Sequence, residues 1–312
     1  MRTRTPLLLL FNLLLCHFVT AQDYERVDAT IKLYPTSFNA PEELSAFITR
    51  DFTSEEEKVR AIYTWIISNV AYEPSEYKQF NYNFKNYRER NIKEEKTRKK
   101  IIARTLQKGI AVCEGYAMLF ERLCELQGIT SYLVRGDIKT NFNDIGRPFK
   151  NTHMWNVVTM DGKSYLYDPT WGAGKYHGKF IKEPSYFYYK TPPQLLAKTH
   201  CPQMPEDSFL MNNFTREGFA SMPLVIQEQL TLNDIESPKE GMISSREGDG
   251  FVNFSVKNVA PKEVTYTYGA DKKNLEFTET DGAISFVVPI ELGKENLLIY
   301  FDNKPALGYR IK

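Results

Sequence analysis

The spacing of apolar residues changes near Pro223, and this change divides the chain into two parts that must fold differently. After this point, apolar and polar residues alternate in short segments separated by turn residues: "FVNFSVKNV", "EVTYTYGA", "NLEFTET", "AISFVVPI", "NLLIYFD" and "ALGYRIK". Alternation with a period of two is typical of half-buried strands. About 85 residues of such segments predict an all-β, Ig-like sandwich domain, which we place at residues 224–312.

Three helices are predicted within residues 22–223, the part that precedes this sandwich. Ser54 and Glu57 form a capping-box signal in front of an apolar helical pattern. A basic helix is predicted over residues 96–106, after an exposed loop, and a mostly apolar helix over residues 113–127. Each of these two helices is followed by a glycine, a common stop signal.

The segments "SYLVRGDI", "HMWNVVTM" and "SYLYDPTW" predict three strands, at residues 131–138, 153–160 and 164–171. Asp161-Gly162 separates the last two and is a strong signal for a two-residue hairpin turn. Helices beside an antiparallel hairpin predict an α+β domain. Residues 172–223 are rich in aromatic residues and prolines and are expected to form mostly loops.

The first 21 residues have the pattern of a secretory signal peptide. Two arginines precede a short apolar run, and small residues stand at −3 and −1 relative to a cleavage site after Ala21. We therefore predict a secreted or periplasmic protein without a stable membrane span. The net charge of +1 argues against nucleic acid as a partner. An odd cysteine count in the mature chain argues against a disulfide framework.

Cys113 stands at the start of the predicted helix 113–127 rather than in its middle. Helical periodicity places it at the edge of the apolar face, so its thiol should point inward. The first amides of a helix lack intrahelical partners and carry partial positive charge, which stabilises a thiolate. The amide of the same residue can donate to an oxyanion. Gly115 leaves this first turn without an obstructing side chain, whereas Cys124 is predicted to be structural.

A nucleophilic cysteine needs a base, and a two-residue turn at Asp161-Gly162 predicts which histidine provides it. Such a turn pairs Met160 with Lys163 and sets His153 opposite Thr170. Asp168 then lies on the same sheet face as His153, one diagonal step away and within reach. A loop one residue longer or shorter would move Asp168 to the opposite face.

The segments "GIAVCEGYAMLFERLCELQGI" and "HMWNVVTMDGKSYLYDPTWGAG" resemble the transglutaminase-like superfamily of papain-like cysteine enzymes. The forms "AVCEGYA" and "DPTWGAG" look most like its kyphoscoliosis-peptidase type, over about residues 50–215. The resemblance implies a cysteine helix against an antiparallel sheet. It also implies Cys113 as nucleophile, His153 as base and acid, and Asp168 as the residue that orients the imidazole. It indicates no second oxyanion donor, for which Trp65 and Tyr72 are weak candidates.

These residues predict an acyl-transfer enzyme that acts on peptide or glutamine-type amides of a protein substrate, with hydrolysis favoured over cross-linking. No cofactor and no metal are expected. The alternative is a non-catalytic scaffold whose β-sandwich binds a protein or a surface polymer. A third hypothesis, metal binding through His177, His200 and Cys201, lacks any supporting ligand spacing.

Overall fold

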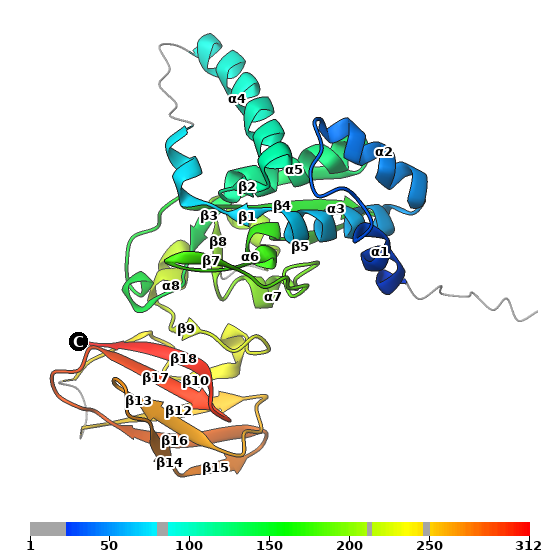
Figure 1. The fold of residues 1–312 in the computed structure, drawn as a ribbon. Helices are drawn as coiled ribbons and strands as arrows, with labels where there is room; N and C mark the ends of the chain where they lie inside the picture. Colours follow the sequence, from blue (N-terminus) through cyan, green and yellow to red (C-terminus); the bar gives the residue numbers. More distant parts are fainter. Residues whose placement is uncertain (1–22, 80–86, 211–213, 246–249) are drawn as a thin grey trace, which may run out of the picture.

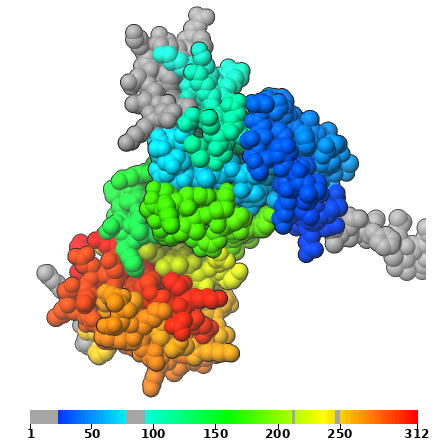
Figure 2. All heavy atoms as spheres, in the orientation of Figure 1, coloured from blue at the N-terminus to red at the C-terminus, as the bar shows by residue number. Residues whose placement is uncertain are grey.

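The computed structural model describes residues 23–79, 87–210, 214–245 and 250–312, and it shows the predicted α+β architecture (Figure 1). The predicted signal peptide lies outside the described residues. Within them, no helix combines the length and apolarity needed to cross a bilayer. The C-terminal residues, orange to red, gather at one end of the molecule, below the blue to green residues of the N-terminal part (Figure 2).

Five helices form most of the N-terminal part: α1 (Tyr24–Ile31), α2 (Pro41–Asp51), α3 (Glu55–Asn69), α4 (Tyr87–Lys108) and α5 (Cys113–Leu126). The capping box between Ser54 and Glu57 is formed at the start of α3, as predicted. Gly109 and Gly128 follow α4 and α5 with φ of 64° and 74°, values that glycine adopts without strain. The predicted stop signals are confirmed.

Helix α4 is longer than the sequence pattern indicated. It begins at Tyr87 instead of near residue 96, so part of the expected loop is helical. Arginine, glutamate and lysine have high helix propensity and occupy much of this stretch, which accounts for the extension without an apolar stripe. In Figure 1, α4 projects away from the rest of the domain.

A four-stranded antiparallel sheet lies under α5, with the order β5-β4-β3-β8. Its strands are β3 (Thr130–Ile138), β4 (His153–Met160), β5 (Lys163–Tyr167) and β8 (His200–Pro202). Helix α5 contacts β3 and β4, and the buried Asn156 side chain donates to the Ala117 carbonyl oxygen at 3.0 Å. Helix α5 is therefore held directly against the strand that begins with His153.

The β4–β5 hairpin has the register that a two-residue turn predicts. Met160 pairs with Lys163 across Asp161 and Gly162, both of which have positive φ. The expected strand through residue 171 is wrong at its end, because β5 stops at Tyr167. Asp168 instead caps the short helix α6 (Pro169–Ala173), whose first residue is a proline that cannot donate to a strand ladder. His153 therefore has no Thr170 opposite it.

Residues 172–223 contain more regular structure than expected. They form the hairpin β6 (Gly174–His177) and β7 (Lys179–Lys182), the helices α7 (Pro193–Leu196) and α8 (Arg216–Ser221), and strand β8. Strand β8 joins the central sheet by antiparallel pairing with β3, where Ile138 pairs with His200. This pairing brings a late segment of the chain to the sheet edge beside the candidate site.

The C-terminal part is a β-sandwich, as the alternating segments predict. One sheet has the order β10-β12-β16-β15, and the other has the order β11-β18-β17-β13-β14 with β9 beside β18. Their strands are β9 (Leu224–Val225), β10 (Ile235–Ser237), β11 (Met242–Ile243), β12 (Phe251–Lys257), β13 (Val264–Thr267), β14 (Lys273–Leu275), β15 (Phe277–Thr280), β16 (Ala283–Pro289), β17 (Asn296–Phe301) and β18 (Lys304–Ile311). The buried rings of Phe254 and Tyr309 meet between the sheets at 5.2 Å. The three earliest strands were not predicted, since two or three residues are too few to show alternation.

Candidate active site

Cys113 is the first residue of α5 and is only 2% exposed. Strand β2 (Ile110–Ala111) leads into it and pairs in parallel with β1 (Ala71–Tyr72). The N-cap residue, Val112, has no side-chain cap for the first amides of the helix. The thiol is free, as are the other two cysteines in the described part of the chain. The predicted position at a helix N-terminus is thus observed.

His153 lies between Cys113 and Asp168. Its Nε2 atom is 2.7 Å from Asp168 Oδ2, and the Cys113 side chain is near enough to the ring to act on its pKa. Because Nε2 faces Asp168, Nδ1 is the nitrogen available to the thiol. Burial of the ring disfavours the imidazolium and would lower the pKa of His153. The charge and hydrogen bond of Asp168, together with the nearby Cys113, outweigh burial and raise this pKa to about 10.

Asp168 is fully buried, and four donors surround its carboxylate. Oδ1 accepts the backbone amides of Thr170 at 2.8 Å and Trp171 at 3.1 Å, because Asp168 caps helix α6. Oδ2 accepts from His153 at 2.7 Å and from His200 at 3.0 Å. Burial alone would raise the pKa of Asp168, but the charges and hydrogen bonds of the two histidines hold it well below its usual value.

His200 is the site residue that the sequence reasoning missed. It begins β8, is 1% exposed, and reaches Asp168 from a segment 32 residues further along the chain. The sequence placed His200 in a region expected to form mostly loops and named it only in the metal hypothesis with His177 and Cys201. No motif surrounds His200, and the scarcity of histidines in the chain is the one signal that pointed toward it.

Indole rings enclose the two histidines. Trp155 stacks with His153 at a centroid distance of 6.0 Å and meets His200 edge-on at 5.1 Å. Trp171 lies 4.5 Å from His200. These apolar rings keep the local dielectric low, so the hydrogen bonds to Asp168 are stronger than they would be in water.

The ligand atoms of His153, Asp168 and His200 lie within 4.8 Å of one another, and imidazole and carboxylate are groups that bind transition metals. Both Nε2 atoms, however, contact the same carboxylate oxygen at distances typical of hydrogen bonds. We therefore assign the cluster to proton-mediated contacts. The structure does not bring His177 and Cys201 into this group, so the hypothesis of a metal site that they would share with His200 gains no support.

Of the two candidates for a second oxyanion donor, only Tyr72 remains. The indole Nε1 of Trp65 donates to the Pro35 carbonyl oxygen at 2.9 Å, and the side chain is fully buried. Tyr72 stands opposite Ala111 in the β1–β2 pair, two residues before Cys113. Burial first, and then negative charge at Cys113, raise the pKa of Tyr72 to about 12, so its hydroxyl keeps its proton at neutral pH.

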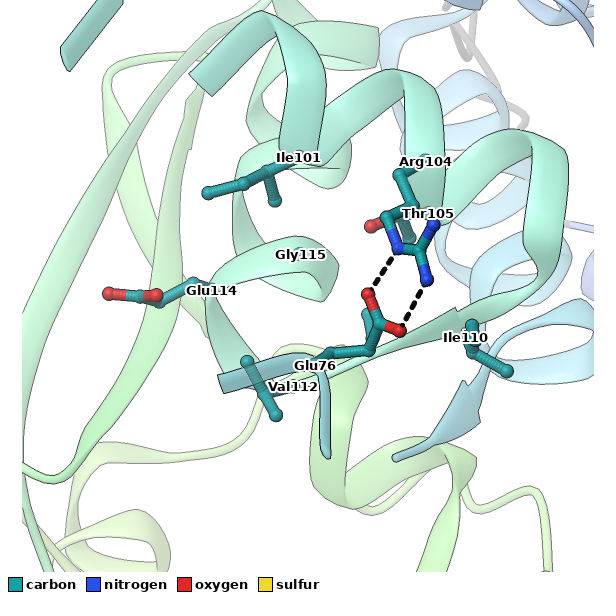
Figure 3. Close-up of a pocket in the computed structure, with 9 residues that line it drawn as sticks. Glu76, Ile101, Arg104, Thr105, Ile110, Val112, Glu114 and Gly115 are labelled. Carbon is teal, nitrogen blue, oxygen red and sulfur yellow. Dashed lines mark hydrogen bonds and ion pairs between the residues drawn. The ribbon is translucent and has the colours of Figure 1, made fainter. Parts of the chain in front are cut away.

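A small pocket lies beside the α5 N-terminus, and Figure 3 shows its lining. There the Arg104 guanidinium holds the Glu76 carboxylate through paired hydrogen bonds, one of them 2.8 Å long. A Cβ on Gly115 would lie 2.5 Å from Thr105 Oγ1. Gly115 therefore permits close packing of α4 against α5, rather than keeping the first turn open as the sequence suggested.

Residues 42–169, which include Cys113, His153 and Asp168, match the family model described as the Transglutaminase-like superfamily. This match covers the region that carries the sequence motifs, so residues 42–169 are similar to a transglutaminase-like core.

The chain is also similar to curated proteins from two mammals. It is 30% identical to the kyphoscoliosis peptidase of Homo sapiens over 193 residues, which cover 58% of this chain and 26% of that protein. The Mus musculus protein of the same name is 30% identical over 188 residues, covering 57% and 25%. The chain thus spans about a quarter of the length of these relatives. A crystal structure of a TGase is 19% identical, with a TM-score of 0.29 over 57% of this chain and 40% of the other.

Proposed function

We propose that this protein is a cysteine enzyme that cleaves peptide or glutamine-type amide bonds through a thioester. The observation that carries the proposal is the buried His153 imidazole, whose Nε2 lies 2.7 Å from Asp168 Oδ2 and whose pKa is raised by both Asp168 and the Cys113 side chain. A nucleophile, a base in contact with it and a third group that orients the base are the parts that nucleophilic catalysis requires.

In the proposed reaction, Cys113 Sγ forms a bond to the carbonyl carbon of the amide, and the thiol proton moves to His153. His153 then gives this proton to the leaving amine as the C–N bond breaks. Asp168 stabilises the imidazolium throughout and is not itself protonated. The backbone amide of Cys113 and the Tyr72 hydroxyl are the proposed donors to the oxyanion.

We propose hydrolysis as the usual second half of the reaction. Water, activated by His153, attacks the thioester carbonyl and releases the acid, and the proton returns to the Cys113 sulfur. A primary amine in place of water would give cross-linking instead. Water is present at far higher concentration than any amine, which favours the hydrolytic outcome.

The test is to incubate the wild-type protein and a Cys113→Ala variant with a library of glutamine-containing peptides, with and without an added primary amine. Mass spectrometry separates the outcomes, because hydrolysis, deamidation and amine incorporation change peptide mass differently. We expect cleaved or deamidated products from the wild type only. A Cys113→Ala variant that turns over peptides at the wild-type rate would contradict the proposal.

We also propose that the protein is exported and that cleavage occurs after Ala21. The support is the charged, apolar and small-residue pattern of the first 21 residues. N-terminal analysis of protein recovered outside the cytoplasm should begin at Gln22. Recovery of the chain with Met1 intact would contradict this proposal without affecting the reaction.

A further inference from the structure

We propose that His200 is a positioning residue of the candidate site, a neutral imidazole whose Nε2–H donates to Asp168 and holds the carboxylate in place for His153. The inference rests on the proposed function and adds a fourth residue to the Cys113, His153 and Asp168 set. His200 acts through Asp168 and does not contact the reacting atoms in this scheme.

The first support is the geometry around one carboxylate oxygen. An ionised carboxylate only accepts hydrogen bonds, so each imidazole nitrogen in contact with it must carry a proton. Asp168 Oδ2 receives His153 at 2.7 Å and His200 at 3.0 Å. The two backbone amides occupy Oδ1. The carboxylate cannot rotate toward or away from His153 without losing the His200 hydrogen bond.

The second support is the partner of the other ring nitrogen. His200 Nδ1 lies 2.8 Å from Thr199 Oγ1, whose hydroxyl can donate to it. A hydroxyl that donates to Nδ1 leaves the single proton of a neutral His200 on Nε2, which is the tautomer that Asp168 needs. The Leu196 carbonyl oxygen lies 3.3 Å from the same hydroxyl and competes for its proton.

The third support is the opposite response of the two imidazoles to their surroundings. Burial, the largest effect, lowers the pKa of His200, and the positive charge of His153 adds to it, while Asp168 and the Leu196 backbone oppose them. The titratable groups that face His200 are Asp168, His153 and the phenol of Tyr188, which burial keeps protonated. Groups on one site with opposite pKa shifts divide the roles between them. His153 moves the proton, and His200 keeps its own.

The fold supports this division of roles through the placement of β8. His200 is fixed by main-chain pairing with Ile138 on β3, next to the β4 strand that carries His153. Its ring is packed between Trp155 and Trp171. The donor to Asp168 is therefore held by the sheet and by two indoles, and not by a mobile loop.

The first experiment observes the tautomers directly. The chain has four histidines, so ¹⁵N-histidine labelling gives a spectrum that single substitutions can assign. The exposed His177 serves as the internal reference for a ring outside the candidate site. We expect His200 to be neutral with its proton on Nε2 from about pH 7 to about pH 8, above the ordinary histidine pKa of about 6.5. A proton on Nδ1 of His200 in this range, alone or with Nε2, would overturn the proposal.

The second experiment separates positioning from folding with two variants. In His200→Gln, the side-chain amide keeps an N–H near the Nε2 position, whereas His200→Leu removes the donor. Iodoacetamide alkylation of Cys113 reports the competence of the site without a known substrate. We expect the Leu variant to react about ten- to a hundredfold more slowly, the size expected for a lost hydrogen bond to a charged group, and the Gln variant to recover most of the rate.

The controls distinguish the possible failures. A His177→Leu variant, changed outside the site, should stay within about twofold of wild type. Equal rates for the Leu variant and wild type, or a Gln variant as slow as the Leu variant, would overturn the role of His200. Wild-type Cys113 that reacts no faster than a thiol in the unfolded chain would instead contradict the proposed function. If the Leu variant does not fold, the tautomer spectrum and the Gln variant still decide.

Discussion

Replacing Asp168 by asparagine changes the charge and the donors at the centre of the candidate site while it keeps the shape. The asparagine Oδ1 can still accept the amides of Thr170 and Trp171. Its Nδ2 then points two N–H groups at the Nε2–H groups of His153 and His200, so donors face donors. His153 must move its proton to Nδ1, toward Cys113, and can no longer accept the thiol proton.

The magnitude follows from the 2.7 Å contact between His153 and Asp168. With charge centres about 4 Å apart and an effective dielectric constant of about 20, the attraction is about 4 kcal/mol. One factor of ten corresponds to about 1.4 kcal/mol, so the imidazolium that stabilises the thiolate is disfavoured by up to about a thousandfold. We expect alkylation of Cys113 near pH 6 to slow by about 10² to 10³.

The assay measures the rate of iodoacetamide incorporation at Cys113 by peptide mass spectrometry. Thiolates and not thiols react with this reagent. The other two cysteines in the described residues do not interfere, because burial raises the pKa of Cys124 and brings that of Cys201 to about 12. Both therefore remain protonated at the pH of the assay.

Asp137→Asn is the matched control, since Asp137 is another buried carboxylate but is held by Arg147 at 2.7 Å. This variant should lose stability and keep an alkylation rate within about twofold of wild type. The reasoning is refuted if Asp168→Asn keeps its native circular dichroism spectrum and is alkylated as fast as wild type. In that case the thiolate would not depend on a charged His153.

Three further predictions address the oxyanion, the ion pair and the packing. Tyr72→Phe should slow acylation of Cys113 by p-nitrophenyl acetate by about 10²-fold and leave alkylation by iodoacetamide unchanged, because only acylation develops an oxyanion. An equal loss of rate in both assays would mean that the substitution disturbs the whole site, and it would contradict an oxyanion role for Tyr72. The raised pKa of His153 stabilises the fold fully below about pH 6.5, the pKa of the unfolded residue, and this contribution disappears as the pH rises toward about 10. In urea unfolding, wild type should thus lose more stability over this range than His153→Gln, and parallel pH profiles would contradict the ion pair. In Gly172→Ala, the new Cβ would lie 2.0 Å from Tyr63 Oη, so we expect a loss of about 1–3 kcal/mol in the free energy of unfolding, whereas Gly269→Ala, where a Cβ meets nothing within 4 Å, should change little.

Local sequence signals were sufficient where local hydrogen bonds and sterics decide the structure. The two-residue turn at Asp161-Gly162 sets the pairing of Met160 with Lys163 and thereby brings the end of β5, next to Asp168, alongside the strand that begins with His153. The capping box at Ser54 and the alternation of the C-terminal strands are local in the same sense. These elements could be predicted because each depends on residues only a few positions apart.

The end of β5 shows where local reasoning reached its limit. Asp168 was predicted to lie within a strand, but it caps α6, and this change turns its Oδ1 toward the backbone amides of Thr170 and Trp171. Its Oδ2 nevertheless lies 2.7 Å from His153 Nε2, so the predicted proximity of the two side chains is observed. The helical cap adds two donors that a strand would not have provided.

The order of Cys113, His153 and Asp168, and the turn that joins the last two, could be determined from the sequence alone. The tertiary structure decided the rest of the site: the pairing of β8 with β3 that delivers His200, and the parallel β1–β2 pair that sets Tyr72 near Cys113. These contacts join segments far apart in the chain. Their geometry depends on which strands finally pair and on the packing of the core, and neither is encoded in a short motif.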